Sequence, residues 1–238
     1  MTVTDSSFSL NSGLVAGGGI GQFNTPLSIL QTSMTSNTAP MAGGLSISAG
    51  PCPAHGGYVL VRDTTIGGNT ATGGQGGRVD NNALSEFINV TIKDNTGGVY
   101  NSGAGPVMFA ANTVLDNPGR LNGDGDGTLP QYHGGNFSDD SSCSLKSNGD
   151  ADRAGLDPKL RPLSMDPTDY TWYYLPLTVS LLIDTAFATR SPRDQRGAAD
   201  PQQMRHWRGG VWLAVPATLG GVHPALRSTA PLPNLKEV

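Results

Sequence analysis

Charged residues are scarce in this sequence. Asp, Glu, Lys and Arg make up 14% of the 238 residues, well below the usual share of about a quarter. Long surface helices depend on Glu, Lys and Arg, so this composition disfavours a helical protein. The net charge of −4 and a pI near 5.4 give no basic surface for nucleic acid, and we expect no such partner.

Long apolar runs and a disulfide framework are missing too. No run approaches the roughly 20 residues that a membrane span needs, and residues 1–4 lack the basic start of a secretory signal. The two cysteines, Cys52 and Cys143, form either one bridge in an oxidising compartment or two unrelated thiols. Because a repeat begins almost at the first residue, we interpret the chain as a piece of a longer protein.

What the sequence has in excess is glycine, with 33 residues, about twice the usual share of roughly 7%. Together with Ser, Thr and Asn, this glycine content suits turns and short strands. It also accompanies a repeat of 22 to 32 residues. Five segments align when each is placed on an asparagine: Asn11, Asn37, Asn69, Asn95 and Asn117.

The aligned segments agree at several positions. The residue three before each asparagine is apolar (Phe8, Met34, Ile66, Ile92, Val114), and so is the residue eight before (Val3, Ile29, Val61, Phe87, Phe109). Four segments are followed by a double glycine (Gly18-Gly19, Gly43-Gly44, Gly76-Gly77, Gly97-Gly98). Loosely patterned Gly/Ser disorder, the alternative, does not explain these coincident apolar columns.

A repeat of this length built of strands and turns predicts an all-β solenoid. We predict a single-stranded right-handed parallel β-helix of about five coils over residues 1–118, with equivalent residues about 4.8 Å apart. Val61 is then expected between Ile29 and Phe87. We expect the asparagines to stack into a hydrogen-bonded ladder at a corner that favours left-handed backbone, and the double glycines to form a second corner.

Beyond residue 118 the repeat pattern is lost. Residues 119–203, rich in Asp, Gly and Pro, are predicted to be an irregular cap, because the last coil of a solenoid has unpaired backbone and an open core. Trp172, Tyr173 and Tyr174 are expected to cover that last coil. Residues 204–238 have no pattern and are interpreted as a disordered or frameshifted tail.

The chain resembles a group of bacterial surface proteins. Its FxxN and GGxI pairs are similar to polymorphic outer-membrane protein repeats. Segments of the second half, including His133–Cys143, Asp157–Leu160, Ser180–Asp184 and Asp194–Gly197, resemble the region after the repeats in choice-of-anchor type secreted β-helix proteins. The resemblance implies a secreted or cell-surface location. Asp184, Asp194 and Arg196 are the conspicuous polar residues of the cap, and we expect them to be structural and not catalytic, with Arg196 pairing with a carboxylate to hold the cap closed.

An enzyme is the alternative, because some β-helix proteins are polysaccharide lyases. Elimination needs an acidic cluster with a basic residue, and the acids near the asparagines are Asp5, Asp63, Asp94 and Asp116, with Arg62 and Lys93 as the bases. No lyase motif is present, and solvated turn residues explain the same pattern. We therefore predict no catalytic residues, and a structural or adhesive module that presents loops to a carbohydrate or to a host or cell-surface partner.

One segment suggests a cofactor. Asn122, Asp124 and Asp126 follow the first half of a calcium loop, but position 133 is His where such a loop has Glu. We therefore expect an acidic Gly-rich turn without metal and no cofactor, with calcium as the alternative.

Overall fold

The computed structural model describes residues 1–48, 57–73, 79–101, 108–124, 130–145, 152–168 and 170–182. All regular structure in these ranges is β, and no helix occurs in them. Accordingly, these ranges contain no helix that is long and apolar enough to cross a membrane.

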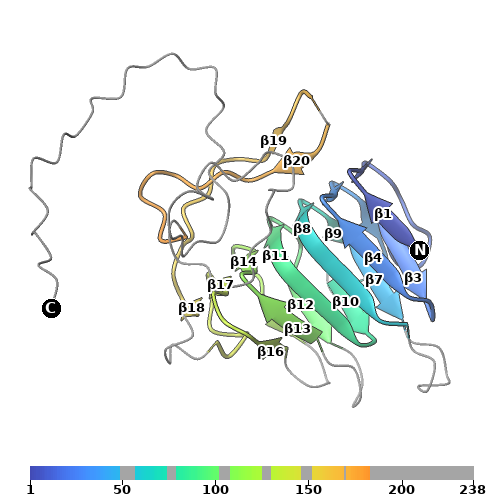
Figure 1. Ribbon diagram of the computed structural model, residues 1–238, viewed down its shortest axis with the longest axis horizontal. Helices are drawn as coiled ribbons and strands as arrows, with labels where there is room; N and C mark the ends of the chain where they lie inside the picture. The colour runs from blue at the N-terminus through green and yellow to red at the C-terminus, as the bar shows by residue number, and fades with distance from the viewer. Residues whose placement is uncertain are drawn as a thin grey trace, which may run out of the picture.

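Two long parallel sheets form the body of the molecule (Figure 1). Strands of the first sheet are β1 (Thr2–Thr4), β2 (Ser7–Ser9), β4 (Leu27–Leu30), β5 (Ser33–Thr35), β8 (Val59–Gly67), β11 (Ser85–Lys93), β13 (Met108–Ala111), β14 (Val114–Asp116), β16 (Gln131–Tyr132), β17 (Phe137–Ser138) and β18 (Arg153–Ala154). Strands of the second sheet are β3 (Ile20–Phe23), β7 (Leu45–Ser48), β10 (Val79–Asn82), β12 (Val99–Asn101) and β15 (Gly123–Asp124).

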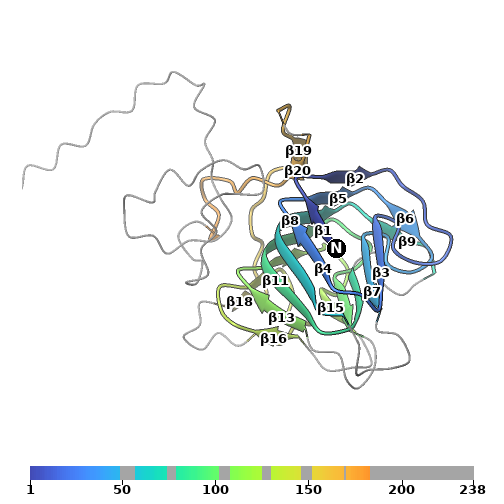
Figure 2. The same cartoon turned by 45° about the vertical axis from the view of Figure 1, so that its right-hand side comes forward.

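The chain alternates between the two sheets, as the turned view of Figure 2 shows. It passes from β1 and β2 through β3 of the second sheet to β4, which pairs in parallel with β1. A short parallel pair, β6 (Thr38–Ala39) with β9 (Thr70–Ala71), belongs to neither of the two sheets and forms a third side of the stack. Stacked parallel sheets without helices are coarsely compatible with the predicted β-helix.

The core between the sheets contains the expected apolar columns. Val61 pairs with Ile29 on one side and with Phe87 on the other, and all three side chains are fully buried. In the second column Ile66 pairs with Met34 and Ile92. The prediction that these residues stack in register around an apolar centre is confirmed.

The fifth repeat differs from the predicted alignment by one residue. Leu115, and not Val114, pairs with Ile92, and Ala110, and not Phe109, pairs with Phe87. The four preceding asparagines each follow a residue with positive φ, namely Leu10, Ser36, Gly68 and Asp94. The fifth follows directly on strand β14, without such a residue. Counting back from Asn117 therefore predicted the wrong inward residues.

We had expected the ladder asparagine itself to have the left-handed backbone of this corner, and this was wrong. The left-handed residue is the one just before the asparagine in four of the five repeats. This placement is physically sensible, because the positive φ turns the chain and the following asparagine can then direct its amide along the stack.

The double glycines are required for space. A Cβ on Gly43 would lie 2.4 Å from the carbonyl oxygen of Thr70, and one on Gly98 would lie 2.1 Å from that of Asn122. Neither glycine has positive φ. Successive repeats thus approach so closely at this corner that only a residue without a side chain fits.

Parallel pairing extends beyond residue 118. Strand β16 pairs with β13, β15 with β12, and β17 with β14, and β18 pairs with β17. The sequence pattern weakens in this part because these strands have two residues each, which is too few for apolar alternation to be recognised.

The segment after β18 lies along the side of the stack. It contains the antiparallel pair β19 (Ser164–Met165) and β20 (Trp172–Tyr173), and β20 lies next to β5 of the second repeat. Tyr174 contacts Gly67 in the third repeat and Lys93 in the fourth. The expectation that residues 172–174 cover the last coil was therefore wrong.

Candidate functional site

The asparagines form a continuous chain of side-chain hydrogen bonds. Each Nδ2 donates to the Oδ1 of the next asparagine at 2.9 to 3.1 Å, from Asn11 through Asn37, Asn69 and Asn95 to Asn117. The backbone N–H of each donor residue reaches the same oxygen. From Asn37 onward, the second Nδ2 proton goes to a carbonyl of the preceding repeat at 2.9 to 3.3 Å.

This arrangement satisfies every donor and acceptor of the three middle amides. Asn37 and Asn69 are fully buried, and Asn95 nearly so. A buried amide that makes all its hydrogen bonds stabilises one unique arrangement of its surroundings, whereas a partly satisfied one is costly. The ladder also has a direction, since in every hydrogen bond between two asparagines the amide donates to the repeat that lies nearer the C-terminal end of the stack.

The ladder ends at a residue that we had considered a calcium ligand. Asn122 accepts from Asn117 Nδ2 at 2.7 Å, and its own Nδ2 donates to Ser138 and to Asp139. Its side chain is fully buried. Of the other proposed ligands, Asp124 lies exposed in β15 and Asp126 is outside the described residues. In the ranges described, no group of three or more His, Cys, Asp or Glu is placed to hold a metal ion.

A second polar column lies at the other corner of the first sheet. Its members all have positive φ and precede the ladder asparagine by five or six residues: Asp5, Gln31, Asp63, Asn89 and Asn112. Asn112 donates to Asn89 at 3.1 Å, and Asn89 donates to Asp63 at 2.8 Å. Sequence reasoning missed this column, although the polar residues recur at a nearly constant distance from the asparagines.

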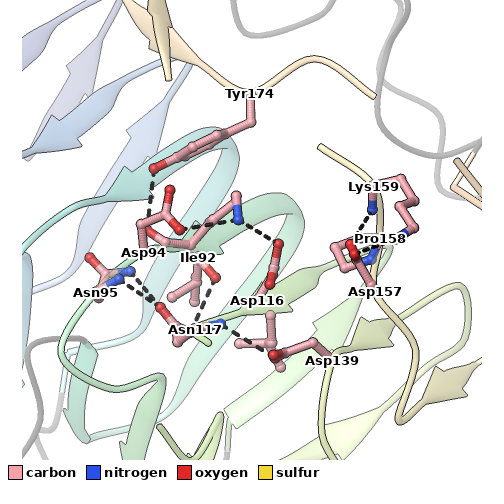
Figure 3. A network of polar contacts seen from close by, with 12 residues as sticks. Ile92, Asp94, Asn95, Asp116, Asn117, Asp139, Asp157, Pro158, Lys159 and Tyr174 are labelled. Carbon is pink, nitrogen blue, oxygen red and sulfur yellow. Dashed lines mark hydrogen bonds and ion pairs between the residues drawn. The ribbon is translucent and has the colours of Figure 1, made fainter. Parts of the chain in front are cut away.

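A charged cluster occupies the surface of the first sheet (Figure 3). Lys93 Nζ lies 2.7 Å from Asp116 Oδ2 and 3.1 Å from Asp94 Oδ1, on two neighbouring repeats. The nitrogen also lies 5.7 Å from the ring centroid of Tyr174, and the Tyr174 hydroxyl donates to the Lys93 carbonyl at 3.4 Å. The lysine side chain is 13% exposed and that of Asp116 is 6% exposed.

Burial and charge act against each other in this cluster. Burial alone would lower the pKa of Lys93, but the hydrogen bond and charge of Asp116, helped by Asp94, raise it above the ordinary value. Burial raises the pKa of Asp116, and the nearby lysine offsets only part of that effect. The pKa of Tyr174 is raised by burial and by the carboxylate of Asp94, so its hydroxyl stays protonated.

The acids and bases considered for a lyase do not gather at one open site. Lys93 is ion-paired with both Asp116 and Asp94 and lies against the ring of Tyr174, and of the three side chains only that of Asp94 is largely exposed. Asp63 belongs to the second polar column, and Asp5 accepts a hydrogen bond from the neighbouring Thr4. A second, more open group of polar side chains lies elsewhere on the first sheet.

That group combines aromatic and charged side chains. Tyr58, 41% exposed, donates to Glu86 Oε2, and the pKa of this tyrosine is raised to about 12 by burial and by Glu86. Arg62 lies one strand from Glu86, on the same sheet. Farther along, the rings of Phe109 and His133 lie 5.0 Å apart at an angle of 52°.

The remaining predictions concern residues that the structure describes only in part. Cys143 is buried and forms no disulfide, while Cys52 lies outside the described residues. Asp184, Asp194, Arg196 and the tail 204–238 lie outside them as well.

Comparison with known proteins gave no family for the chain: no protein-family model, curated protein or solved structure matched it. The resemblance to bacterial surface β-helix proteins therefore stays a prediction, beside the all-β parallel architecture that the structure shows.

Proposed function

We propose that the stacked repeats form a right-handed parallel β-helix that acts as a rigid scaffold in a secreted or cell-surface bacterial protein. Parallel strands joined by a crossover are right-handed in about 98% of cases, and each repeat returns to the first sheet through a strand of the second. A stack of this kind gives a stiff rod, because each repeat is fixed by two neighbours.

This proposal rests on one observation: the polar side chains make their contacts with one another inside the protein. The asparagines are buried and bond to one another, and the lysine on the sheet is ion-paired with two aspartates and lies against the ring of Tyr174. Catalytic acids and bases need access to a substrate. Groups that are already satisfied inside the protein support a structural role.

For the adhesive part of the function we propose the group around Tyr58, Glu86 and Arg62 as the contact for a carbohydrate. A half-exposed aromatic ring offers an apolar face, and a carboxylate and a guanidinium offer directional hydrogen bonds. Ligand sites commonly combine a few such polar groups with aromatic surface. Phe109 pairs with Glu86 on the next strand, and its ring contact with His133, which follows β16, extends this surface.

The test is a binding screen of the purified chain on immobilised neutral and acidic polysaccharides, with parallel detection of unsaturated elimination products. We expect binding without turnover, weakened about tenfold or more by Tyr58→Ala and unchanged by Tyr170→Ala, which removes an exposed ring elsewhere. Elimination products would replace the scaffold proposal with the lyase alternative. Absence of binding to every polysaccharide would refute the carbohydrate contact.

A further inference from the structure

Two lines of side chains run along the stack on the outer face of the first sheet. At the start of strands β8, β11 and β13 the residues alternate between the buried core and this face, and the parallel register places equivalent residues side by side. The segment with β19 and β20 lies away from β13 and β16 (Figure 1). The first line is Ser28, Leu60, Glu86, Phe109 and Gln131, and the second is Leu30, Arg62, Ile88, Ala111 and His133.

The aromatic rings on this face are spaced along the stack. Tyr58 directly precedes β8, and Phe109 is in β13, two pairing steps further. The two rings are therefore separated by about 10 Å along the stack axis. Glu86 is on the strand between them, where it accepts from the Tyr58 hydroxyl and pairs with Phe109. The exposed ring of His133 lies 5.0 Å from that of Phe109 and widens the second aromatic surface.

This spacing selects the shape of a carbohydrate ligand. The apolar face of a sugar ring packs on an aromatic ring, and each pyranose of an extended glycan lengthens the chain by about one strand spacing, about 5 Å. Rings two spacings apart therefore contact the first and third of three consecutive sugars, and the second sugar faces Glu86. A glycan that curls leaves a straight line of side chains after one or two sugars.

The charges on this face select an uncharged ligand. The two lines contain one carboxylate, Glu86, and one guanidinium, Arg62, so their charges cancel. A glycan with a carboxylate on each sugar needs an excess of positive charge. Arg62 Nε is buried and has no hydrogen-bond partner within the described ranges. A shift of this side chain towards a sugar hydroxyl would supply the acceptor that the nitrogen lacks.

We propose that this face binds three consecutive sugars of an uncharged, extended pyranose glycan whose chain runs along the stack, across the strands. Tyr58 packs on one end sugar, Glu86 and Arg62 bind hydroxyls of the middle sugar, and Phe109 with His133 packs on the other end sugar. This inference rests on the carbohydrate contact proposed above, and it adds the class, length and direction of the ligand.

The test is calorimetry of the full chain with oligosaccharides of one to six sugars from cellulose, xylan and mannan, which are uncharged and extended. We expect at least one of these series to bind with an affinity that rises up to three sugars and is level beyond. Maltohexaose has the same sugar as the cellulose series in a curled chain, and hexagalacturonate is extended but acidic. Both should bind about tenfold or more weakly than the best uncharged hexasaccharide.

Two variants test the roles of individual residues. Phe109→Ala should lower the affinity for the trisaccharide about fivefold or more, to that of the disaccharide, because the third sugar loses its ring. Phe23→Ala, which removes an exposed phenylalanine of the second sheet, is the matched control and should change nothing. Glu86→Gln keeps the shape of the side chain and removes its charge, so it should strengthen hexagalacturonate binding about threefold or more. Circular dichroism and the unfolding midpoint establish that each variant is folded.

The outcomes separate this inference from the proposed function. Maltohexaose or hexagalacturonate binding as tightly as the uncharged extended series would overturn the ligand class, and an unchanged trisaccharide affinity in Phe109→Ala would overturn the direction along the stack. In both cases the carbohydrate contact stands if Tyr58→Ala still weakens binding. Absence of oligosaccharide binding would overturn this inference alone where the polysaccharide screen is positive, and would overturn the contact as well where that screen is negative.

Discussion

The most informative perturbation of the stack is Asn69→Asp, in the middle of the ladder. The change keeps the size of the side chain and an oxygen that accepts from Asn37 N and Nδ2, at 2.9 and 3.0 Å. It removes the two donors that serve Asn95 Oδ1 and the Met34 carbonyl, both at 2.9 Å. Asn69 is fully buried, so no water replaces the lost donors.

The expected loss of stability follows from these contacts. The Met34 carbonyl loses a buried donor, at about 2 kcal/mol, and Asn95 Oδ1 loses one of its two donors but keeps the backbone N–H of Asn69, at about 1 kcal/mol. We therefore expect the free energy of unfolding to fall by about 3 kcal/mol at neutral pH. The new carboxyl is buried among acceptors, and its folded-state pKa should lie above its unfolded value. Its protonated form is then favoured in the folded protein, so the loss should shrink as the pH falls through the raised folded-state pKa towards about 4, the unfolded value, and should not change further below it.

Equilibrium urea unfolding followed by circular dichroism measures this difference. The matched control is Asn11→Asp, which lies at the exposed end of the same ladder, where water can replace the lost donors; we expect about 1 kcal/mol or less. A loss below about 1 kcal/mol for Asn69→Asp, or equal losses at both positions, would refute the reasoning that the buried amides are individually required.

Three further perturbations test the packing and the charged cluster. Ile66→Ala should cost about 3 kcal/mol in urea unfolding, because it opens a cavity in the fully buried column, whereas Leu14→Ala, at a 95% exposed position, should change stability by less than about 0.5 kcal/mol. Gly67→Ala should expose Tyr174 to a fluorescence quencher, because the new Cβ would lie 2.7 Å from the tyrosine hydroxyl. Lys93→Met should cost about 2 kcal/mol at neutral pH by leaving two carboxylates without their cation. Since the folded-state pKa of Lys93 is raised from 10.5, the stability that its charge contributes is present below that pH and is lost as the pH rises through the folded-state pKa. The variant should therefore unfold with a flatter pH dependence in that alkaline range.

Each of these has a result that would contradict it. Equal costs for the buried and the exposed alanine substitutions would mean that the apolar column is not packed as described. Unchanged quenching after the Gly67→Ala substitution would show that Tyr174 does not pack against Gly67. A lysine variant with the parent's alkaline slope would show that the charged cluster does not contribute to stability.

The apolar columns were predictable because their signal repeats. Val61 and Ile66 stand at fixed distances from an asparagine in a pattern that recurs five times, and stacked repeats convert that regularity directly into neighbours. The one-residue shift of the fifth repeat was hidden because Val114 and Leu115 are both apolar. The shift arises because the fifth repeat lacks the residue with positive φ before its asparagine. A backbone conformation of this kind cannot be recognised from a pattern of apolar residues.

The charged cluster was partly predictable. Asp94 and Asp116 precede ladder asparagines on consecutive repeats, so their closeness followed from the alignment. The contact of Tyr174 with Lys93 joins residues 81 positions apart, and it depends on the path of an irregular segment. Local sequence patterns contain no information about such a path, and the aromatic residues were accordingly expected at the wrong part of the stack.

The central claim, stacking of the repeats in register, is tested most directly by distances between spin labels in a background without Cys52 and Cys143. Thr2 and Gln131 are both exposed and are linked by five steps of strand pairing, through Ser28, Leu60, Glu86 and Phe109. At about 4.8 Å per step, labels at Thr2 and Gln131 should lie about 24 Å apart, and labels at Ser28 and Gln131 about 19 Å apart. Narrow distributions that differ by about one strand spacing would support the stack, whereas broad distributions or equal distances for the two pairs would contradict it.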